Sequence, residues 1–238
     1  MNNSYGKPEK LEAVNTAVVP VPKLEEDCYD WWERHDQVLK LKDEIDPEVV
    51  LIGDSITHFW GGLPESGTIH GTGQAWESVF GNRRVLNLGF GWDRTQNVLW
   101  RLDHGQISGL SPQWVVINIG TNNTSGTDNA RVNTAAEIRD GVRAICERIR
   151  ASSPPTQIIL MAVFPREAAP DHPRRRHINE INELYRELAG ALDLTFLDIG
   201  PELLTGDGRL LPEIAFDGCH LTEQGYRKWA DALRKVLA

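Results

Sequence analysis

Cysteine is scarce in this chain. Its three residues, Cys28, Cys146 and Cys219, lie far apart and show no C-x-x-C spacing. Neither a disulfide framework nor a cysteine-based zinc site follows from such a set. The H-E-x-x-H spacing of zinc hydrolases and the phosphate-binding P-loop are also missing. We therefore expect a protein without a bound metal and without a cofactor.

Long apolar runs and positive charge are in short supply as well. The longest runs are strand-sized, such as residues 49–52, whereas a bilayer span takes about 18 residues. The chain has 25 Lys and Arg against 34 Asp and Glu, a net charge of −9. Such a charge repels phosphate backbones and anionic membrane surfaces, so we expect neither a nucleic-acid partner nor membrane insertion. The first ten residues lack a signal-peptide core, which predicts a cytoplasmic protein, or a secreted or periplasmic one whose leader has been removed.

The pattern of apolar residues predicts one α/β domain with an N-terminal extension. Residues 1–26 carry scattered proline and charge, which is typical of an extended arm lying over a domain. Helical spacing over 27–46 predicts a lead-in helix that Pro47 ends, and Trp31 and Trp32 on it could stack on a sugar or anchor the helix to the core. Short apolar runs then alternate with longer amphipathic ones, as in β-α-β units. Residues 27–238 should thus form a single three-layer α/β/α domain with a five-stranded parallel sheet. We expect strands at 49–52, 84–88, 114–119, 157–163 and 195–197, and further helices at 95–103, 134–151, 174–192 and 222–237.

A serine stands at the end of the first predicted strand, in Gly53-Asp54-Ser55. Ligands of open α/β sheets bind beyond the carboxyl ends of the strands, so Ser55 could serve there as a nucleophile. Alternatively, Asp54 or Ser55 only caps the helix that follows. The tripeptide leaves both interpretations open, and it is not the G-x-S-x-G elbow of α/β-hydrolases.

A serine nucleophile needs a base, and the base needs an orienting group. Among the seven histidines, His220 follows Asp217 by three residues in a glycine-containing turn before the last predicted helix. Such a turn can aim both side chains into one cleft. The alternative is a turn aspartate beside an exposed histidine. His58 and His70 are closer to Ser55 in sequence, but neither has an acidic neighbour in a comparable turn.

Acyl transfer also needs hydrogen-bond donors for the oxyanion. The third predicted strand leads into Gly120-Thr121-Asn122-Asn123, where Asn122 could donate its amide group. The second leads into Gly89-Phe90-Gly91-Trp92, whose backbone N–H groups could add donors. That loop lacks the third glycine of a dinucleotide-binding fingerprint. Each loop by itself is also compatible with an ordinary β-α turn.

Taken in order, these four loops resemble the four sequence blocks of the SGNH, or GDSL-type, hydrolase superfamily. The resemblance spans the chain from Val49 to the C-terminus and implies a flavodoxin-like sheet. Within the superfamily it is similar to the branch of the brain platelet-activating-factor acetylhydrolase catalytic subunits. The blocks are Gly53-Asp54-Ser55, Asn87-x-Gly89 through Thr95, Gly120-Thr121-Asn122-Asn123 and Asp217-x-x-His220, and the branch features are Val98–Leu102, Asn122-Asn123 and Phe164-Pro165-Arg166.

The resemblance implies a role for each matching residue. Ser55 would be the nucleophile, His220 the base and then the acid, and Asp217 its orienting carboxylate. The Ser55 N–H and Asn122 would be oxyanion-hole donors. The remaining donor of the family is the backbone N–H of a glycine, and Trp92 occupies that position here. We expect Trp92 to adopt a φ angle that suits a bulky residue, with its indole walling the pocket.

The resulting hypothesis is a serine esterase that removes short acyl groups, above all acetyl, through an acyl-enzyme. A cleft bordered by Trp92 and Trp60 suits a sugar ring, which favours a carbohydrate O-acetylesterase, with Asp54, Asn123 and Arg166 as further substrate-binding residues. Phospholipid acetylhydrolase, lysophospholipase and thioesterase activities are alternatives of the same class. A ligand-binding module on a hydrolase fold is the non-enzymatic alternative, which the intact serine, histidine and aspartate argue against. The oligomeric state stays open and includes a homodimer.

Overall fold

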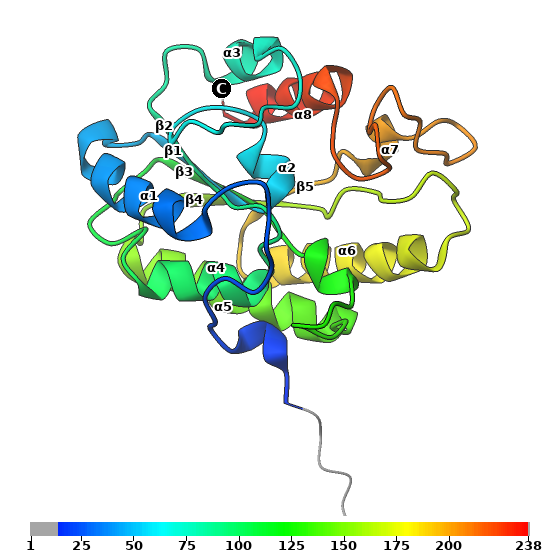
Figure 1. The fold of residues 1–238 in the computed structure, drawn as a ribbon, viewed down its shortest axis with the longest axis horizontal. Coiled ribbons are helices and arrows are strands. Elements are labelled where there is room, and N and C mark those ends of the chain that lie inside the picture. The colour runs from blue at the N-terminus through cyan, green and yellow to red at the C-terminus, as the bar shows by residue number, and fades with distance from the viewer. Residues whose placement is uncertain (1–13, 238) are drawn as a thin grey trace, which may run out of the picture.

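The computed structural model describes residues 14–237 and shows a parallel five-stranded sheet between helices (Figure 1). The order β2-β1-β3-β4-β5 is that of flavodoxin-like folds, in which the ligand site lies where the strand order reverses, between β1 and β3. The predicted three-layer fold with five parallel strands is confirmed. The strands are β1 Val49–Gly53, β2 Val85–Gly89, β3 Trp114–Asn118, β4 Gln157–Met161 and β5 Thr195–Leu197.

The strands form because their residues are apolar on both faces. Every residue of β1, β2 and β3 is buried, as expected for a parallel sheet covered on both sides. Along β1, Val50 and Ile52 belong to one core cluster and Val49 and Leu51 to the other. Successive side chains of a strand point to opposite faces, so a single apolar run supplies both cores.

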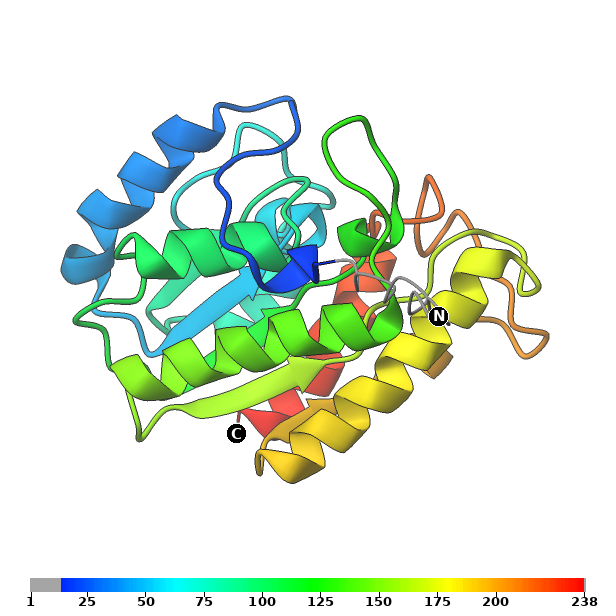
Figure 2. The same ribbon diagram turned by 90° about the horizontal axis from the view of Figure 1, so that it is seen from below.

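Helices cover the two faces of the sheet. The first core contains residues of α1, α4, α5 and α6, and the second contains residues of α3 and α8. Figure 2 shows α4, α5 and α6 side by side across one face. The long helices begin and end within four residues of the predicted limits. They are α1 Trp31–Ile45, α4 Thr95–Asp103, α5 Ala135–Ser152, α6 Pro173–Ala191 and α8 Glu223–Val236.

A helix after Ser55 was expected, but the limits of the short helices were not predicted from the sequence. Each spans two turns or less, too few for an apolar period to emerge. One of them, α2, begins at Ser55 and is central to the site. The short elements are α2 Ser55–His58, α3 Gln74–Phe80, α7 Gly200–Leu203 and the 3-10 helices η1 Thr16–Val18 and η2 Asn122–Thr124.

The N-terminal segment lies against α4 and α5. Residues 1–13 of the predicted arm are outside the described part of the chain. The segment that follows is not extended throughout, because it contains η1, in which Ala17 is fully buried. The Thr95 hydroxyl donates to the Ala17 carbonyl at 2.8 Å, and the Asn97 side-chain amide donates to the Pro22 carbonyl at 2.6 Å.

Within residues 14–237, no helix combines the length and the apolarity needed to cross a bilayer.

Candidate active site

Ser55 lies at the carboxyl end of β1, where the chain turns into α2. The turn depends on Gly53, because a Cβ atom there would lie 2.1 Å from Thr57 Oγ1 and 2.6 Å from the Asn118 carbonyl oxygen. The side-chain amide of Asn87, on the neighbouring strand β2, donates to the Thr57 carbonyl at 2.9 Å. The glycine and the asparagine of the first two sequence blocks therefore hold the helix that carries the serine.

The structure brings Ser55, His220 and Asp217 together as a hydrogen-bonded chain. Ser55 Oγ lies 2.9 Å from His220 Nε2, and His220 Nδ1 lies 2.7 Å from Asp217 Oδ2. The other carboxylate oxygen accepts the backbone N–H groups of Cys219 and His220 at 2.9 and 2.7 Å. Asp217 thus orients the imidazole and also shapes the turn that presents it. This is the geometry by which a base activates a serine hydroxyl.

The Asp217 carboxylate is stabilised in its charged form. Partial burial raises its pKa, but the hydrogen bonds from His220 and Cys219 outweigh burial and leave the pKa below its usual value. A carboxylate that stays ionised at neutral pH can stabilise the imidazolium that forms during catalysis.

Aromatic rings surround His220, a feature that we did not infer from the sequence. The His220 ring stacks on Phe216 with centroids 6.0 Å apart and meets His70 edge-on at 5.4 Å. Burial, and then the neighbouring His220, lower the pKa of His70, so this ring is neutral at pH 7. The only sequence signal was the place of Phe216 directly before Asp217.

The loops after β2 and β3 carry Trp92 and Asn122, the two residues expected to supply oxyanion donors besides Ser55. Asn122 opens η2, and its Nδ2 donates to the Asp93 carbonyl at 3.0 Å, which uses one of its two amide hydrogens and leaves the other for a ligand. Trp92 has a φ angle of +62°. The expectation of a φ suited to a bulky residue is therefore wrong: Trp92 adopts the left-handed backbone that favours glycine, at a cost of about 1–2 kcal/mol. Its side chain is 37% exposed.

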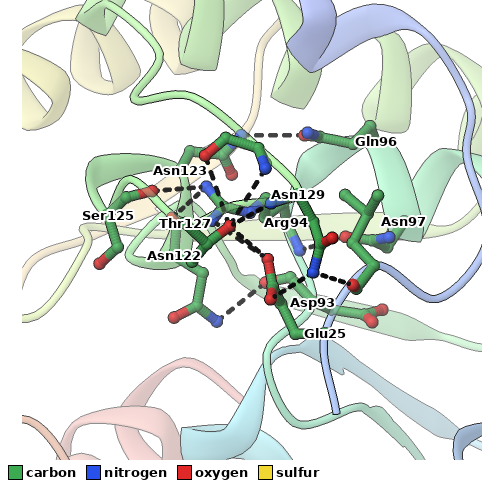
Figure 3. A network of polar contacts seen from close by, with 12 residues as sticks. Glu25, Asp93, Arg94, Gln96, Asn97, Asn122, Asn123, Ser125, Thr127 and Asn129 are labelled. Carbon is green, nitrogen blue, oxygen red and sulfur yellow. Dashed lines mark hydrogen bonds and ion pairs between the residues drawn. The ribbon is translucent and has the colours of Figure 1, made fainter.

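Two predicted substrate-binding residues are instead buried structural residues. Asp54 is fully buried and caps α2, accepting the Ile56 N–H at 3.0 Å, and burial raises its pKa to about 7. Asn123 is fully buried as well. Its Nδ2 donates to Gln96 Oε1 at 3.0 Å (Figure 3) and also to Asn133 Oδ1 at 3.0 Å. Neither side chain has surface to offer a substrate, so these two assignments are corrected.

Trp60 is also turned away from the reaction centre. Its indole is 1% exposed and stacks on Trp229 and Tyr226, with centroids 4.2 and 5.4 Å away. It cannot provide the stacking face that we expected for a sugar. Arg166 is half-buried, and its Nη1 lies 3.4 Å from Ser125 Oγ and 3.5 Å from Thr121 Oγ1, beside the loop that carries Asn122.

A fully buried arginine, Arg94, holds the backbone of the loop that carries Asn122. Arg94 Nη1 donates to the carbonyl oxygens of Asn122 and Ser125 (Figure 3). Its Nη2 lies 3.8 Å from Glu25 Oε1, which belongs to the N-terminal segment. Sequence reasoning missed this role, because a charged side chain gives no sign in the sequence that it is buried.

A groove of about 970 Å³ lies beside the loop between α2 and α3. Its walls include Leu63, Ile69 and Trp76, together with polar side chains of the same loop. The triad residues do not line it. The groove nevertheless comes close to the base, because Ile69 directly precedes His70, the residue whose ring contacts His220.

Comparisons with known proteins assign the chain to a family. A profile of the GDSL-like Lipase/Acylhydrolase family matches residues 51–228. The alpha1 subunit of platelet-activating factor acetylhydrolase IB from Rattus norvegicus is 32% identical over 208 residues, which cover 87% of this chain and 82% of that protein.

Solved structures share the fold. A Bacteroides fragilis protein described as an acylhydrolase superposes with a TM-score of 0.68 at 23% identity, over 90% of this chain and 98% of that one. An acetylxylan esterase of Geobacillus stearothermophilus gives a TM-score of 0.64 at 22% identity, over 79% of this chain and 93% of that one. These two likenesses show the fold. The profile match and the identity to the acetylhydrolase subunit show the family: the chain belongs to the GDSL-like Lipase/Acylhydrolase family.

Proposed function

We propose that this protein is a serine esterase that works through an acyl-enzyme. Ser55 Oγ attacks the ester carbonyl carbon while His220 Nε2 takes the hydroxyl proton, and the carbonyl π electrons move onto oxygen. The N–H groups of Ser55 and Trp92 and the side chain of Asn122 stabilise that oxyanion. Collapse of the intermediate expels the alcohol, which leaves with the proton from His220. Water then repeats the sequence on the acyl-enzyme and releases the acid. The observation that carries the proposal is the hydrogen-bonded chain from Ser55 through His220 to Asp217.

The substrate that we propose is a short-chain ester, above all an acetyl ester, of a carbohydrate. The supporting observation is the position of Trp92. Its backbone N–H belongs to the proposed oxyanion hole, and its indole is 37% exposed. A partly exposed ring beside the reaction centre offers a face for a sugar ring and limits the length of the acyl group. The groove beside Ile69 and Trp76 offers room for the rest of the alcohol.

Acetyl phospholipid hydrolysis is the second candidate. Its support is the 32% identity to an acetylhydrolase subunit and the exposed apolar side chains of Leu63, Ile69 and Phe216. Phe216 directly precedes the triad aspartate and is 52% exposed.

One set of assays separates these candidates. p-Nitrophenyl esters of increasing chain length measure the acyl preference, and acetate release is then followed from acetylated xylan, acetylated sialic acid and an acetylated phospholipid. We expect acetyl preference and the highest kcat/KM on an acetylated carbohydrate. The highest value on the phospholipid would favour the second candidate. No hydrolysis of any ester above the level of Ser55→Ala would favour a binding module and overturn the esterase proposal.

A further inference from the structure

All polar groups of Asp93 are hydrogen-bonded inside the protein, directly behind the proposed oxyanion hole. Its carboxylate is 2% exposed, and Oδ1 accepts the Trp31 indole N–H at 2.8 Å. Oδ2 accepts Arg101 Nε at 2.7 Å. Its backbone N–H donates to the Phe90 carbonyl at 3.2 Å, and its carbonyl accepts Asn122 Nδ2 at 3.0 Å. One residue therefore joins α1, α4 and the loops after β2 and β3.

Asp93 directly follows Trp92, whose left-handed backbone a bulky residue rarely adopts. Such conformations persist only where the surrounding structure over-determines them. If the φ angle of Trp92 relaxed toward negative values, the peptide unit before Trp92 and the chain after it would turn relative to one another, and the Trp92 N–H would change direction relative to Asp93. A shift of Asp93 in the same movement would displace its carbonyl and release the Asn122 amide. Two of the three proposed oxyanion donors thus depend on how firmly Asp93 is held.

The partners of the Asp93 carboxylate are themselves rigidly placed. Trp31 is 2% exposed, and its indole lies 5.4 Å from the Phe90 ring and stacks on His35 at 5.8 Å. The Arg101 guanidinium is fully buried and lies 4.0 Å above the Phe90 ring. The two donors therefore present fixed N–H directions to the carboxylate. Trp31 belongs to α1, which precedes the residues matched by the family profile.

We infer that Trp31 and Arg101 are positioning residues for the oxyanion hole: through the Asp93 carboxylate they hold the Trp92 N–H and the Asn122 amide in place. This inference deepens the proposed esterase function and rests on it. A purely structural pair would stabilise the fold without affecting the chemical step. Positioning residues should instead act on kcat, because the oxyanion exists only after the ester carbonyl has been attacked.

The test uses Trp31→Phe, which keeps an aromatic ring in the core and removes the indole N–H donor together with the five-membered ring that carries it. The matched control is Trp32→Phe, on the same helix, since Trp32 is 47% exposed and makes no hydrogen bond to Asp93. With p-nitrophenyl acetate as substrate, we expect kcat of Trp31→Phe to fall about 10- to 100-fold, as for a displaced catalytic group, while KM stays within about twofold. Trp32→Phe should keep both constants.

Arg101→Lys tests the second anchor without removing its charge. The fixed Nε–H direction is lost, so the same fall in kcat at unchanged KM is expected, and thermal unfolding of each variant shows that it is folded at the assay temperature. A folded Trp31→Phe or Arg101→Lys variant with wild-type kcat, or with an increase in KM as the main change, would overturn the inference.

A second readout excludes a loss of fold as the cause. A boronic acid forms a tetrahedral adduct on Ser55, and its affinity should weaken by the same factor as kcat. Trp92→Gly removes the strain at the oxyanion loop, because glycine adopts positive φ readily. In that background, Trp31→Phe should cost several-fold less in kcat than in the wild type, and an equal cost would contradict the inference. If the wild type hydrolyses no ester, the proposed function fails and this inference fails with it, whereas an active wild type with unaffected variants overturns the inference alone.

Discussion

Ser55 Oγ lies 2.9 Å from His220 Nε2, although 165 positions separate the two residues. A second contact fixes the helix that carries Ser55. The hydroxyl of Tyr226 on α8 donates to the Ile56 carbonyl in the first turn of α2 at 2.7 Å. The helix that carries the serine is thereby tied to the helix that follows the histidine. Ser55 and His220 are therefore positioned by two helices that are joined by a hydrogen bond.

Ser55→Ala should reduce hydrolysis of p-nitrophenyl acetate by more than about 10⁴-fold and leave the fold intact, because only the hydroxyl oxygen is lost. His220→Ala should cost about as much, since the unactivated hydroxyl is a weak nucleophile. Initial rates and circular dichroism of both variants check this. Activity above a few per cent in either variant would rule out its assigned role.

Asp217→Asn should impair the reaction less than loss of the serine, by a margin of about tenfold or more. In the reaction itself the carboxylate orients the ring and stabilises the imidazolium, and the amide oxygen of asparagine can still accept the N–H groups of the turn. The loss should appear in kcat, with KM for p-nitrophenyl acetate little changed. An effect as large as that of Ser55→Ala would contradict this ranking of the two residues.

Trp92→Gly should raise the ratio of butyryl to acetyl turnover, because the indole takes space beside the oxyanion loop. In the wild type we expect acetyl to be preferred over butyryl by about tenfold or more, since each excluded methylene loses ~0.8 kcal/mol of burial and adds steric strain. Because Trp92 has a φ of +62°, glycine at this position also relieves backbone strain. This relief should offset part of the stability that is lost with the partly exposed ring, so we expect only a small change in the unfolding temperature. An unchanged ratio would show that the indole points away from the acyl group.

Asp54→Asn should stabilise the protein at alkaline pH. The carboxyl loses its proton near 3.8 in the unfolded chain but only at about 7 in the fold, because burial opposes its charge. The protonated Asp54 carboxyl therefore makes its full contribution to the free energy of unfolding below pH 3.8, and this contribution is lost as the pH rises through 7. Asparagine can still cap α2, so the variant should gain roughly 1–3 kcal/mol in unfolding free energy at pH 8.5 and little at pH 4. Urea unfolding at both values measures this, and a loss of stability at pH 8.5 would contradict it.

Glu137→Gln should lower the free energy of unfolding at neutral pH by about 1–2 kcal/mol. Glu137 completes the capping box of α5 and accepts a hydrogen bond from the Arg131 guanidinium. The hydrogen bond from Arg131, followed by the bond from the Thr134 N–H, lowers its pKa from 4.5 to about 2. The stabilisation is thus present above pH 4.5 and is lost as the pH falls toward 2. The difference between variant and wild type should shrink over that interval. A difference that stays constant from pH 6 to pH 3 would point to lost packing instead of lost charge.

Much of the fold could be predicted because it is encoded locally. Apolar runs such as 49–52 and 114–119 are long enough for buried strands, and the stretches between them have the helical period, so strand order in the chain and the α/β class follow from periodicity. Short elements did not follow, because α2 and η2 are too brief to show a period and form only where the loops around them pack.

The candidate triad was also accessible from the sequence. Gly53-Asp54-Ser55 ends a strand, and Asp217 stands three residues before His220, so each pattern limits the chemistry that its residues can perform. The substrate-facing residues were not accessible in this way. Asp54, Trp60 and Asn123 carry side chains typical of binding sites, but the tertiary structure turns all three inward.

The sequence by itself therefore determined the class of the fold, the family and the order of the candidate catalytic blocks, because these depend on neighbours along the chain. Only the tertiary structure decided the conformation at Trp92. A tryptophan alone favours negative φ, and the positive angle is held by contacts of Asp93 with Trp31, 62 positions away, and with Arg101 on the next helix. Burial and backbone strain depend on such distant partners, so no local sequence pattern predicts them.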